Sequence, residues 1–290
     1  MAESSRLAMD PAATRLSAPR RIVVLAPHPD DEVVACGVAA MRAVRKGARV
    51  SVLYLTTGVP PCETLWFWQR RGYAAREQRR LDEAAGAASL LGLGSSGVLH
   101  IPSRRLLHHL DRAEVEIGRV LDGVGATELW VPAFEGAHQD HDAANALAAR
   151  FRDRLPVLEF AAYNYAGGRA HSNRFPEGSA GVVELRASRE EAELKRRALE
   201  LYRSERGNLR HIRVGEEQYR LLPRHDYLRP PHPGALFRER FQWVPLRHPR
   251  IDFTPSAEIY SVLGEWSAAR GAAPASVGAT GEVQHVPLSG

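Results

Sequence analysis

The chain has 290 residues, of which 44% are hydrophobic, 25% charged and 7% aromatic, a composition typical of a globular protein that folds without disulfides. Its two cysteines, Cys36 and Cys62, exclude a disulfide scaffold and a zinc site made only of cysteines. No stretch approaches the ~18 apolar residues of a transmembrane helix, and the N-terminus lacks the apolar core of a secretory signal. We therefore expect a cytoplasmic protein.

The charge is modestly basic, with a formal net charge of +5 at pH 7. Lys46 and Lys195 are the only lysines, and all other basic residues are arginines. These arginines are scattered among the acidic residues, whereas a nucleic-acid-binding face gathers them into a stripe. The sequence therefore predicts no nucleic-acid partner, and its charge is more compatible with an anionic small substrate or one at a membrane surface.

Strand and helix patterns alternate along most of the chain. Short apolar runs predict strands at residues 22–26, 50–55, 98–101, 128–131, 157–163 and 182–188. Helical spacing predicts helices at residues 32–46, 69–91, 110–121, 140–151 and 190–202. Such alternation with short loops indicates an α/β fold with a doubly wound, mostly parallel sheet. In that fold, ligands bind beyond the carboxyl ends of the strands.

The two ends of the chain differ from its middle. Residues 1–20 and 271–290 are rich in small residues without periodicity, so we predict tails at both ends. Residues 21–270 are expected to form one domain. Proline-interrupted segments at 222–227 and 241–245 predict an irregular C-terminal cap that lies near the pocket.

Histidine and aspartate side chains gather after two of the predicted strands. The first strand is followed by His28, Asp30, Asp31 and Glu32, and the fourth by His138, Asp140, His141 and Asp142. Because strand carboxyl ends bring loops together, the two groups are expected to meet. Two imidazoles and one carboxylate, such as His28, Asp31 and His141, make a hydrolytic metal site with one open position. A water in that position has its pKa lowered from 15.7 towards ~7.

Asp30 and His138 remain beside these candidate ligands. A carboxylate next to such a water can act as general base, and a second imidazole can stabilise an oxyanion or protonate a leaving group. The alternative is structural, since Asp30, Asp31 and Asp140 could simply cap the helices that follow them. That both loops carry His and Asp at a strand end favours the metal site. His108 and His109 precede a helix and are interpreted as surface residues.

The two motifs together resemble those of the PIG-L/LmbE-like family of zinc-dependent N-deacetylases. The similarity lies in the sequence His-Pro-Asp-Asp-Glu at 28–32 and in His-Gln-Asp-His at 138–141, and it extends from Arg21 to about Arg154. It implies a Rossmann-like three-layer fold. It also implies hydrolysis of an N-acyl group, usually N-acetyl, on an amino sugar or its conjugate. Zn²⁺ is the implied cofactor, although a His/His/Asp set also accepts Fe²⁺.

The resemblance also implies roles for single residues. His28, Asp31 and His141 would bind the metal, while Asp30 would act as general base. His138 would stabilise the oxyanion or act as acid, with Asp140 orienting it. Arg80 matches a position that lies near the sugar in relatives; its alternative is an exposed helix arginine.

Two departures from the family pattern concern the substrate side. Residues 56–61 stand where many relatives have an acidic residue, and Gly136 stands where some have tyrosine. Neither departure changes a residue of the metal site, but the substrate contacts of relatives cannot be transferred to this chain. The segment Trp66–Trp68 is either an aromatic wall against a sugar or an anchor that packs its loop onto the body. Cys62, in the same loop, is interpreted as a bystander.

Other functions stay open at this point. One alternative is an amidase that cleaves a thiol-sugar conjugate, or a deacylase for longer chains. Another is a non-catalytic, metal-dependent sugar-binding protein. Asp30 and His138 favour catalysis, because a protein that had lost turnover need not keep side chains that do not ligate the metal. The expected partner is a small N-acylated amino sugar, and the sequence does not indicate an oligomeric state.

Overall fold

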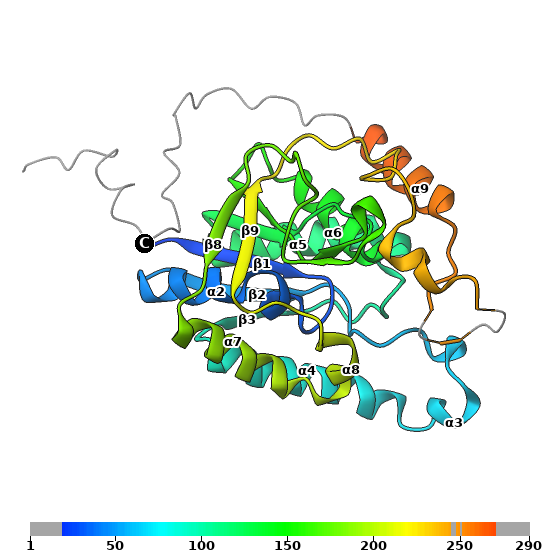
Figure 1. Cartoon of the computed structure of the whole chain (residues 1–290), viewed down its shortest axis with the longest axis horizontal. Helices are drawn as coiled ribbons and strands as arrows, with labels where there is room; N and C mark the ends of the chain where they lie inside the picture. The colour runs from blue at the N-terminus through cyan, green and yellow to red at the C-terminus, as the bar shows by residue number, and fades with distance from the viewer. Residues whose placement is uncertain (1–18, 245–247, 250, 271–290) are drawn as a thin grey trace, which may run out of the picture.

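A computed structural model describes residues 19–244, 248–249 and 251–270. Its centre is a seven-stranded sheet in the order β3-β2-β1-β4-β5-β9-β8, covered by helices on both faces (Figure 1). The predicted tails fall almost wholly outside the described residues, as does the last residue of the predicted 241–245 segment. The strands are β1 (Arg21–Ala26), β2 (Arg49–Tyr54), β3 (Gly94–Val98), β4 (Glu128–Pro132), β5 (Val157–Phe160), β8 (Val183–Arg186) and β9 (Glu216–Leu221).

The first five strands of the sheet are parallel, which confirms the predicted mostly parallel architecture. β1 pairs with β2 on one side and with β4 on the other, both in parallel register. β9 runs antiparallel to β5, and β8 runs antiparallel to β9. Since β1 and β4 are neighbours, the loops that leave their carboxyl ends emerge side by side.

Helices pack on both faces of the sheet and bury a separate apolar cluster on each. One cluster joins the sheet to α2, α4 and α7, with Val38, Ala84 and Ala198 among its buried residues. The other joins it to α5, α6 and α9 and includes Ile117 and Leu147. The α-helices are α2 (Asp31–Arg45), α3 (Phe67–Arg70), α4 (Tyr73–Leu90), α5 (Leu110–Val124), α6 (Gln139–Ala149), α7 (Arg189–Leu201), α8 (Arg206–Leu209) and α9 (Ser256–Ala269).

Three predicted elements have different bounds in the structure. The helix predicted at 69–91 is divided into α3 and α4, because Gly72 between them has the left-handed φ of 75°. The strand predicted at 98–101 is wrong by four residues, since the Gly/Ser segment before it forms the ladder of β3. The apolar residues Leu99 and Ile101 are buried, but outside the ladder. The strand predicted at 157–163 is shortened to β5.

The part of the chain after β5 holds elements that the sequence patterns did not reveal. β9 enters the sheet, the short strands β6 (Tyr163–Asn164) and β7 (His171–Ser172) pair with each other, and α9 closes one face. The described residues between β9 and α9 are irregular, as predicted, apart from the 3₁₀ turn η5 (Phe237–Phe241). Within the described ranges, no helix is long and apolar enough to cross a membrane.

Candidate active site

The loops after β1 and β4 bring together the three side chains predicted as metal ligands. Candidate ligand atoms of His28, Asp31 and His141 all lie within 4.8 Å of one another. Asp31 Oδ2 is at the centre, 3.1 Å from His28 Nδ1 and 3.2 Å from His141 Nε2. Two imidazoles and a carboxylate that converge in this way are a donor set suited to a divalent metal.

The local backbone explains why His28 and Asp31 face each other. The backbone N–H groups of Asp30 and Asp31 both donate to the carbonyl of His28, which makes a tight turn at the start of α2. The hydroxyl of Thr56 at the end of β2 donates to the carbonyl of Pro27 and anchors this turn to the sheet. Asp30 precedes α2, but its side chain makes no capping hydrogen bond. The alternative that Asp30 only caps this helix is therefore wrong.

His141 carries the strongest sign that the cluster binds something. His141 lies in α6 with its side chain fully buried, and neither ring nitrogen makes a well-aligned hydrogen bond with a described residue, although Nε2 lies 3.2 Å from Asp31 Oδ2. Buried polar atoms are nearly always paired, because an unpaired one costs about 1–3 kcal/mol. One nitrogen faces Asp31 and the cluster, where a metal would satisfy it. The residues present therefore fit a metal ion.

Asp140 holds the far side of the His28 ring. Its Oδ2 lies 3.0 Å from His28 Nε2 and also accepts hydrogen bonds from the Ser103 hydroxyl and the Arg104 backbone N–H. Burial alone would lower the pKa of His28, but the hydrogen bonds to Asp140 and Asp31 raise it to about 10. A carboxylate on one ring nitrogen orients the other towards a metal. The Asp140 carboxylate thus acts mainly on His28.

His138 has a defined tautomer. It is the N-cap of α6, and its Nδ1 accepts a hydrogen bond from the backbone N–H of Asp140 at 3.1 Å. Burial, followed by the charge of His28, lowers the pKa of His138 to about 3. A neutral imidazole that accepts at Nδ1 carries its proton on Nε2. His138 therefore offers an N–H donor beside the cluster, and Asp140 orients it through its backbone.

Asp30 makes a buried ion pair with Arg80 of α4. Arg80 Nη2 lies 3.1 Å from Asp30 Oδ2, and Arg80 Nη1 lies 3.3 Å from the carboxylate of Glu205. Burial raises the pKa of Asp30 to about 6 against the opposing charge of Arg80. Arg80 is only 4% exposed, so its interpretation as an exposed helix arginine is wrong. At Gly58, whose φ is 70°, a Cβ would lie 2.9 Å from the guanidinium.

These side chains line one cleft of about 680 Å³. His28, Asp30, Asp31, His138 and Arg80 form part of its wall. The cleft is also lined by residues that the sequence patterns did not identify, which are Tyr163, His211, Phe237, Arg104 and Arg240. Tyr163 belongs to the hairpin formed by β6 and β7, and His211 follows α8. Arg104 lies in the loop after β3, and Phe237 and Arg240 belong to η5. No local sequence motif marks any of them.

Tyr163 is a missed residue whose ring lies beside a candidate ligand. Its ring lies 5.3 Å from the His141 ring and 4.8 Å from the Phe237 ring, between centroids. Glu135 holds the backbone here, since it accepts the N–H groups of Ala162 and Tyr163. The loop before α6 thus anchors the hairpin as well as the cluster.

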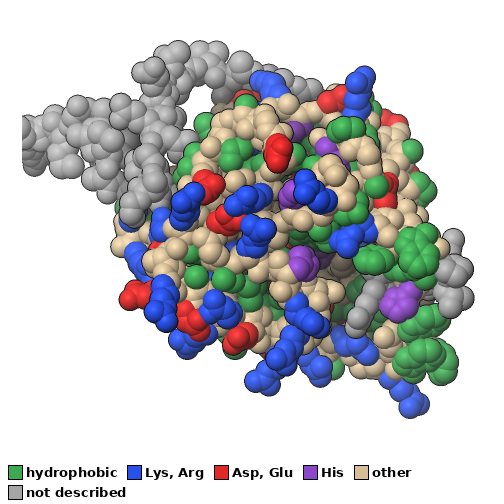
Figure 2. Space-filling model, in the orientation of Figure 1, with side chains coloured by type: hydrophobic (Ala, Val, Ile, Leu, Met, Phe, Trp, Pro, Cys, Tyr) green, Lys and Arg blue, Asp and Glu red, His purple; other side chains and the backbone are tan. Residues whose placement is uncertain are grey.

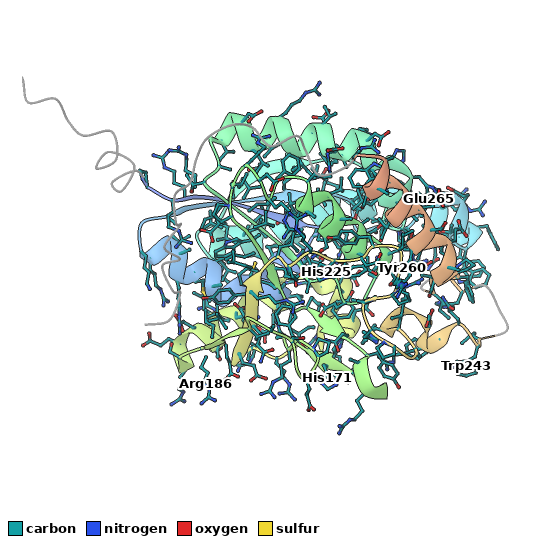
Figure 3. All side chains as sticks on the ribbon, turned by 90° about the horizontal axis from the view of Figure 1, so that it is seen from above. His171, Arg186, His225, Trp243, Tyr260 and Glu265 are labelled. Atoms are coloured by element: carbon teal, nitrogen blue, oxygen red, sulfur yellow. The ribbon has the colours of Figure 1, made fainter. Side chains whose placement is uncertain are left out.

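The loop before α6 is also held by Asp142 and by Tyr260, a residue that the sequence patterns did not identify. Asp142 accepts the backbone N–H of Gly136 and the hydroxyl of Tyr260 in α9. Figure 3 shows Tyr260 directed into the interior, whereas Trp243 lies at the margin. At Gly136, with φ 67°, a Cβ would lie 2.7 Å from Leu236, so a larger residue does not fit here.

Other residues that the sequence singled out lie away from the cluster. His108 and His109 border a separate hollow near Trp266. Trp66 and Trp68 stack on each other with centroids 5.3 Å apart, and Phe67 and Trp68 are largely exposed. Trp66 is half-buried, and its ring centroid lies 6.3 Å from that of His248. None of the three is among the residues that line the cleft, and the two alternatives for this segment stay predictions.

Comparison with known proteins confirms the resemblance inferred from the two motifs. Residues 23–151 match the model of the PIG-L family, described as GlcNAc-PI de-N-acetylase. This match spans β1 to α6 and so contains both loops of the cluster. No curated protein sequence matches the chain.

Solved structures share the fold at low sequence identity. The A40926 pseudoaglycone deacetylase Dbv21 is 20% identical with a TM-score of 0.53, over 67% of this chain and 86% of that one. The zinc-inhibited form of teicoplanin deacetylase Orf2 is 18% identical with a TM-score of 0.51, over 69% and 98%. N,N'-diacetylchitobiose deacetylase from Pyrococcus horikoshii is 18% identical with a TM-score of 0.51, over 70% and 84%.

Proposed function

We propose that this chain, whose residues 23–151 belong to the PIG-L family, is a metal-dependent hydrolase that removes an N-acetyl group from an amino sugar or its conjugate. One observation carries the proposal. The donor atoms of His28, Asp31 and His141 converge within 4.8 Å of one another, and His28 and Asp31 line a cleft. Asp30 and His138 flank them in the same cleft.

The metal would be held by His28, Asp31 and His141. The unpartnered ring nitrogens of buried His141 and the carboxylate of Asp140 behind His28 support this set. When bound, the metal supplies a Lewis acid that lowers the pKa of a water and polarises the acyl carbonyl. Zn²⁺ suits these ligands and so does Fe²⁺. His28, His138 and Asp140 form a second group of possible metal ligands. A metal ion bound there in excess would occupy His138 and remove its N–H donor from the reaction.

The chain's own groups provide the proton transfers. Asp30, held by Arg80, accepts a proton from the attacking water. The Nε2–H of the neutral His138 donates a hydrogen bond to the oxyanion that develops on the acyl oxygen. The proton that Asp30 accepted passes to the departing nitrogen, which returns Asp30 to its carboxylate form. The products are a free amine and acetate.

The substrate class rests on the family and on the neighbours. The family description names a GlcNAc conjugate, and the printed names of the neighbours include deacetylases for a pseudoaglycone and for diacetylchitobiose. A cleft of about 680 Å³ is large enough for a sugar with a substituent. Asp30 and His138 favour catalysis over mere sugar binding.

The test is release of the free amine from a panel of N-acetylglucosamine conjugates, with N-butyryl and N-octanoyl analogues for longer chains. The metal is stripped and then returned at one equivalent of Zn²⁺ or Fe²⁺. We expect release only after metal is returned, and none from His141→Ala, whereas His109→Ala, outside the cluster, stays active. Equal activity of the stripped and reloaded protein would refute the proposal.

A further inference from the structure

Tyr163 carries a hydroxyl group that the mechanism above does not use. The residue begins the hairpin of β6 and β7 and lines the cleft together with His28 and Asp31. Its ring lies against that of His141, with 5.3 Å between centroids, and Phe237 packs on it at 4.8 Å. A ligand bound at the three candidate metal ligands therefore lies next to this tyrosine.

The fold itself does not need the Tyr163 hydroxyl. Other tyrosines of the core donate their hydroxyls to buried acceptors, which are Glu32 for Tyr54 and Tyr202, Asn145 for Tyr227 and Asp142 for Tyr260. No residue within the described ranges forms a hydrogen bond with the hydroxyl of Tyr163, although its side chain is half-buried. Since polar groups away from bulk water are normally paired, this hydroxyl is left for an occupant of the cleft.

The hydroxyl of Tyr163 is a donor in the electrostatic field of the candidate site. Burial, followed by the charges of Asp31 and Asp30, raises its pKa well above the usual range. Those carboxylates are the candidate metal ligand and the candidate general base, so the hydroxyl lies within reach of both charges. A phenol is protonated at neutral pH even with its ordinary pKa of about 10, and here it keeps that proton all the more firmly.

The backbone of Tyr163 is fixed to the loop that carries His138. Glu135, which is fully buried in that loop, accepts the N–H groups of Ala162 and Tyr163, each at 2.8 Å. The next residue, Gly136, stands where some relatives have tyrosine, but its φ of 67° and a Cβ position 2.7 Å from Leu236 leave no room for a side chain. A phenol therefore reaches this loop from the hairpin instead.

The basic side chains at the cleft do not replace this donor. Arg80 is held by two carboxylates, and the Arg104 side chain donates to two backbone carbonyls. Arg76 and Arg79 are exposed, and Figure 2 shows Lys and Arg side chains spread over one face of the molecule with His among them. An exposed arginine must be ordered before it can act, whereas a fixed donor needs no reorganisation when charge develops.

We propose that the Tyr163 hydroxyl donates a hydrogen bond to the oxyanion that develops on the acyl oxygen, as a second donor beside His138. This inference rests on the proposed function, because it names a donor for that reaction. The proton stays on the tyrosine, and only the hydrogen bond strengthens as the acyl oxygen becomes negative. A donor that acts on developing charge stabilises the transition state more than the bound substrate, so it affects kcat more than KM.

The test removes only the hydroxyl. Tyr163→Phe keeps the ring that packs on His141 and Phe237. Tyr165→Phe is the matched control, because Tyr165 lies under the guanidinium of Arg240 and is not among the described residues that line the cleft. Initial rates of amine release give kcat and KM on the N-acetylglucosamine conjugate that the wild type cleaves best, and metal content is measured on the same preparation.

A binding measurement accompanies the kinetics. Calorimetry on the metal-loaded chain compares the methylphosphonamidate of glucosamine, whose tetrahedral phosphorus carries an anionic oxygen, with glucosamine itself, which has no such oxygen. A merely structural role of Tyr163 would weaken the binding of both ligands or lower the metal content. Loss of a donor to the oxyanion affects the phosphonamidate alone.

We expect kcat of Tyr163→Phe to fall by about 10²–10³, with KM and metal content little changed and the control like the wild type. The phosphonamidate should bind roughly tenfold more weakly or worse, and glucosamine as before. A wild-type kcat in Tyr163→Phe, or equal phosphonamidate affinity in the two proteins, would overturn the inference. A wild type that releases no amine from any conjugate contradicts the proposed function instead. The phosphonamidate affinities then decide the inference alone, and a wild type that does not bind this ligand also overturns it.

Discussion

Lys195 and Glu217 form a fully buried ion pair, 2.7 Å between Nζ and Oε1, at a break in helix α2. The Glu217 carboxylate accepts the backbone N–H groups of Val38 and Ala39 at 2.8 and 2.9 Å. Lys195 donates to the carbonyl of Val34 at 3.0 Å. Side chains from α7 and β9 thus replace hydrogen bonds that a continuous helix would make within itself.

The break lies just after the turn of α2 that begins with Asp31. Cys36 has non-helical φ and ψ of −138° and 22°, and Asn173 provides a second donor to Val34. The first turn therefore does not have to follow the direction of the rest of α2. The ion pair fixes the angle at which this turn presents Asp31 to the histidines.

Removal of the lysine from this pair should destabilise the fold. Lys195→Met leaves Glu217 as an unpaired buried charge, which costs about 3–5 kcal/mol of unfolding free energy. Urea denaturation followed by circular dichroism measures this loss. Lys46→Met is the matched control, because Lys46 is the only other lysine and is exposed. Similar midpoints for both variants would contradict the assigned role.

Asp140→Asn tests whether the carboxylate orients His28. The amide cannot hold the imidazole as a carboxylate does, so metal affinity should fall roughly 10–100-fold. Competitive titration with a chelating dye measures it. Asp122→Asn, at an exposed aspartate of α5 that pairs with Arg154, should bind metal like the wild type. An unchanged affinity in Asp140→Asn would show that the hydrogen bond to His28 is dispensable.

His138→Ala separates hydrogen-bond donation to the oxyanion from metal binding. We expect kcat to fall by about 10²–10³, with one metal still bound per chain, because His138 is outside the favoured ligand set. Initial rates and metal analysis on the same preparation provide the two readouts. His108→Ala removes an exposed imidazole and should leave both unchanged. Loss of metal in His138→Ala would instead place this residue among the ligands.

Glu191 predicts a specific loss of stability in acid. Hydrogen bonds from Arg42 lower its pKa from 4.5 to about 2. A carboxyl whose folded pKa is depressed stabilises the fold above pH 4.5 and loses this contribution as the pH falls towards 2. The difference in Tm between wild type and Glu191→Gln should therefore shrink from pH 5.5 to pH 3.5. For Glu193→Gln, on the exposed face of α7, the difference should stay near zero, and a constant gap for Glu191→Gln would refute the link.

The sequence predicted the part of the site that is built from local motifs. His28, Asp31 and His141 are adjacent because β1 and β4 are parallel neighbours, and both strands could be recognised from their apolar runs. The role of Asp140 was only partly foreseen. Its backbone orients His138, but its carboxylate lies against His28, a contact that depends on the angle between two loops.

The part of the cleft lining that lies outside the two loops could not be predicted, for a physical reason. Tyr163, His211 and Arg240 belong to short, irregular elements with no periodicity, and only long-range packing brings them to the cleft. The burial of Arg80 was equally hidden, because its neighbours Arg76 and Arg79 follow the same pattern and are exposed. Helical spacing alone does not show which arginine reaches Asp30.

The central claim is that Asp30 acts on the attacking water while other residues hold the metal. The most direct measurement is acetate release together with metal content for wild type and Asp30→Asn, on an N-acetylglucosamine conjugate that the wild type cleaves. We predict about one metal per chain in both proteins and a loss of release of at least 10²-fold in Asp30→Asn. Wild-type rates in Asp30→Asn, or a wild-type protein that binds no metal even after resupply, would contradict the account.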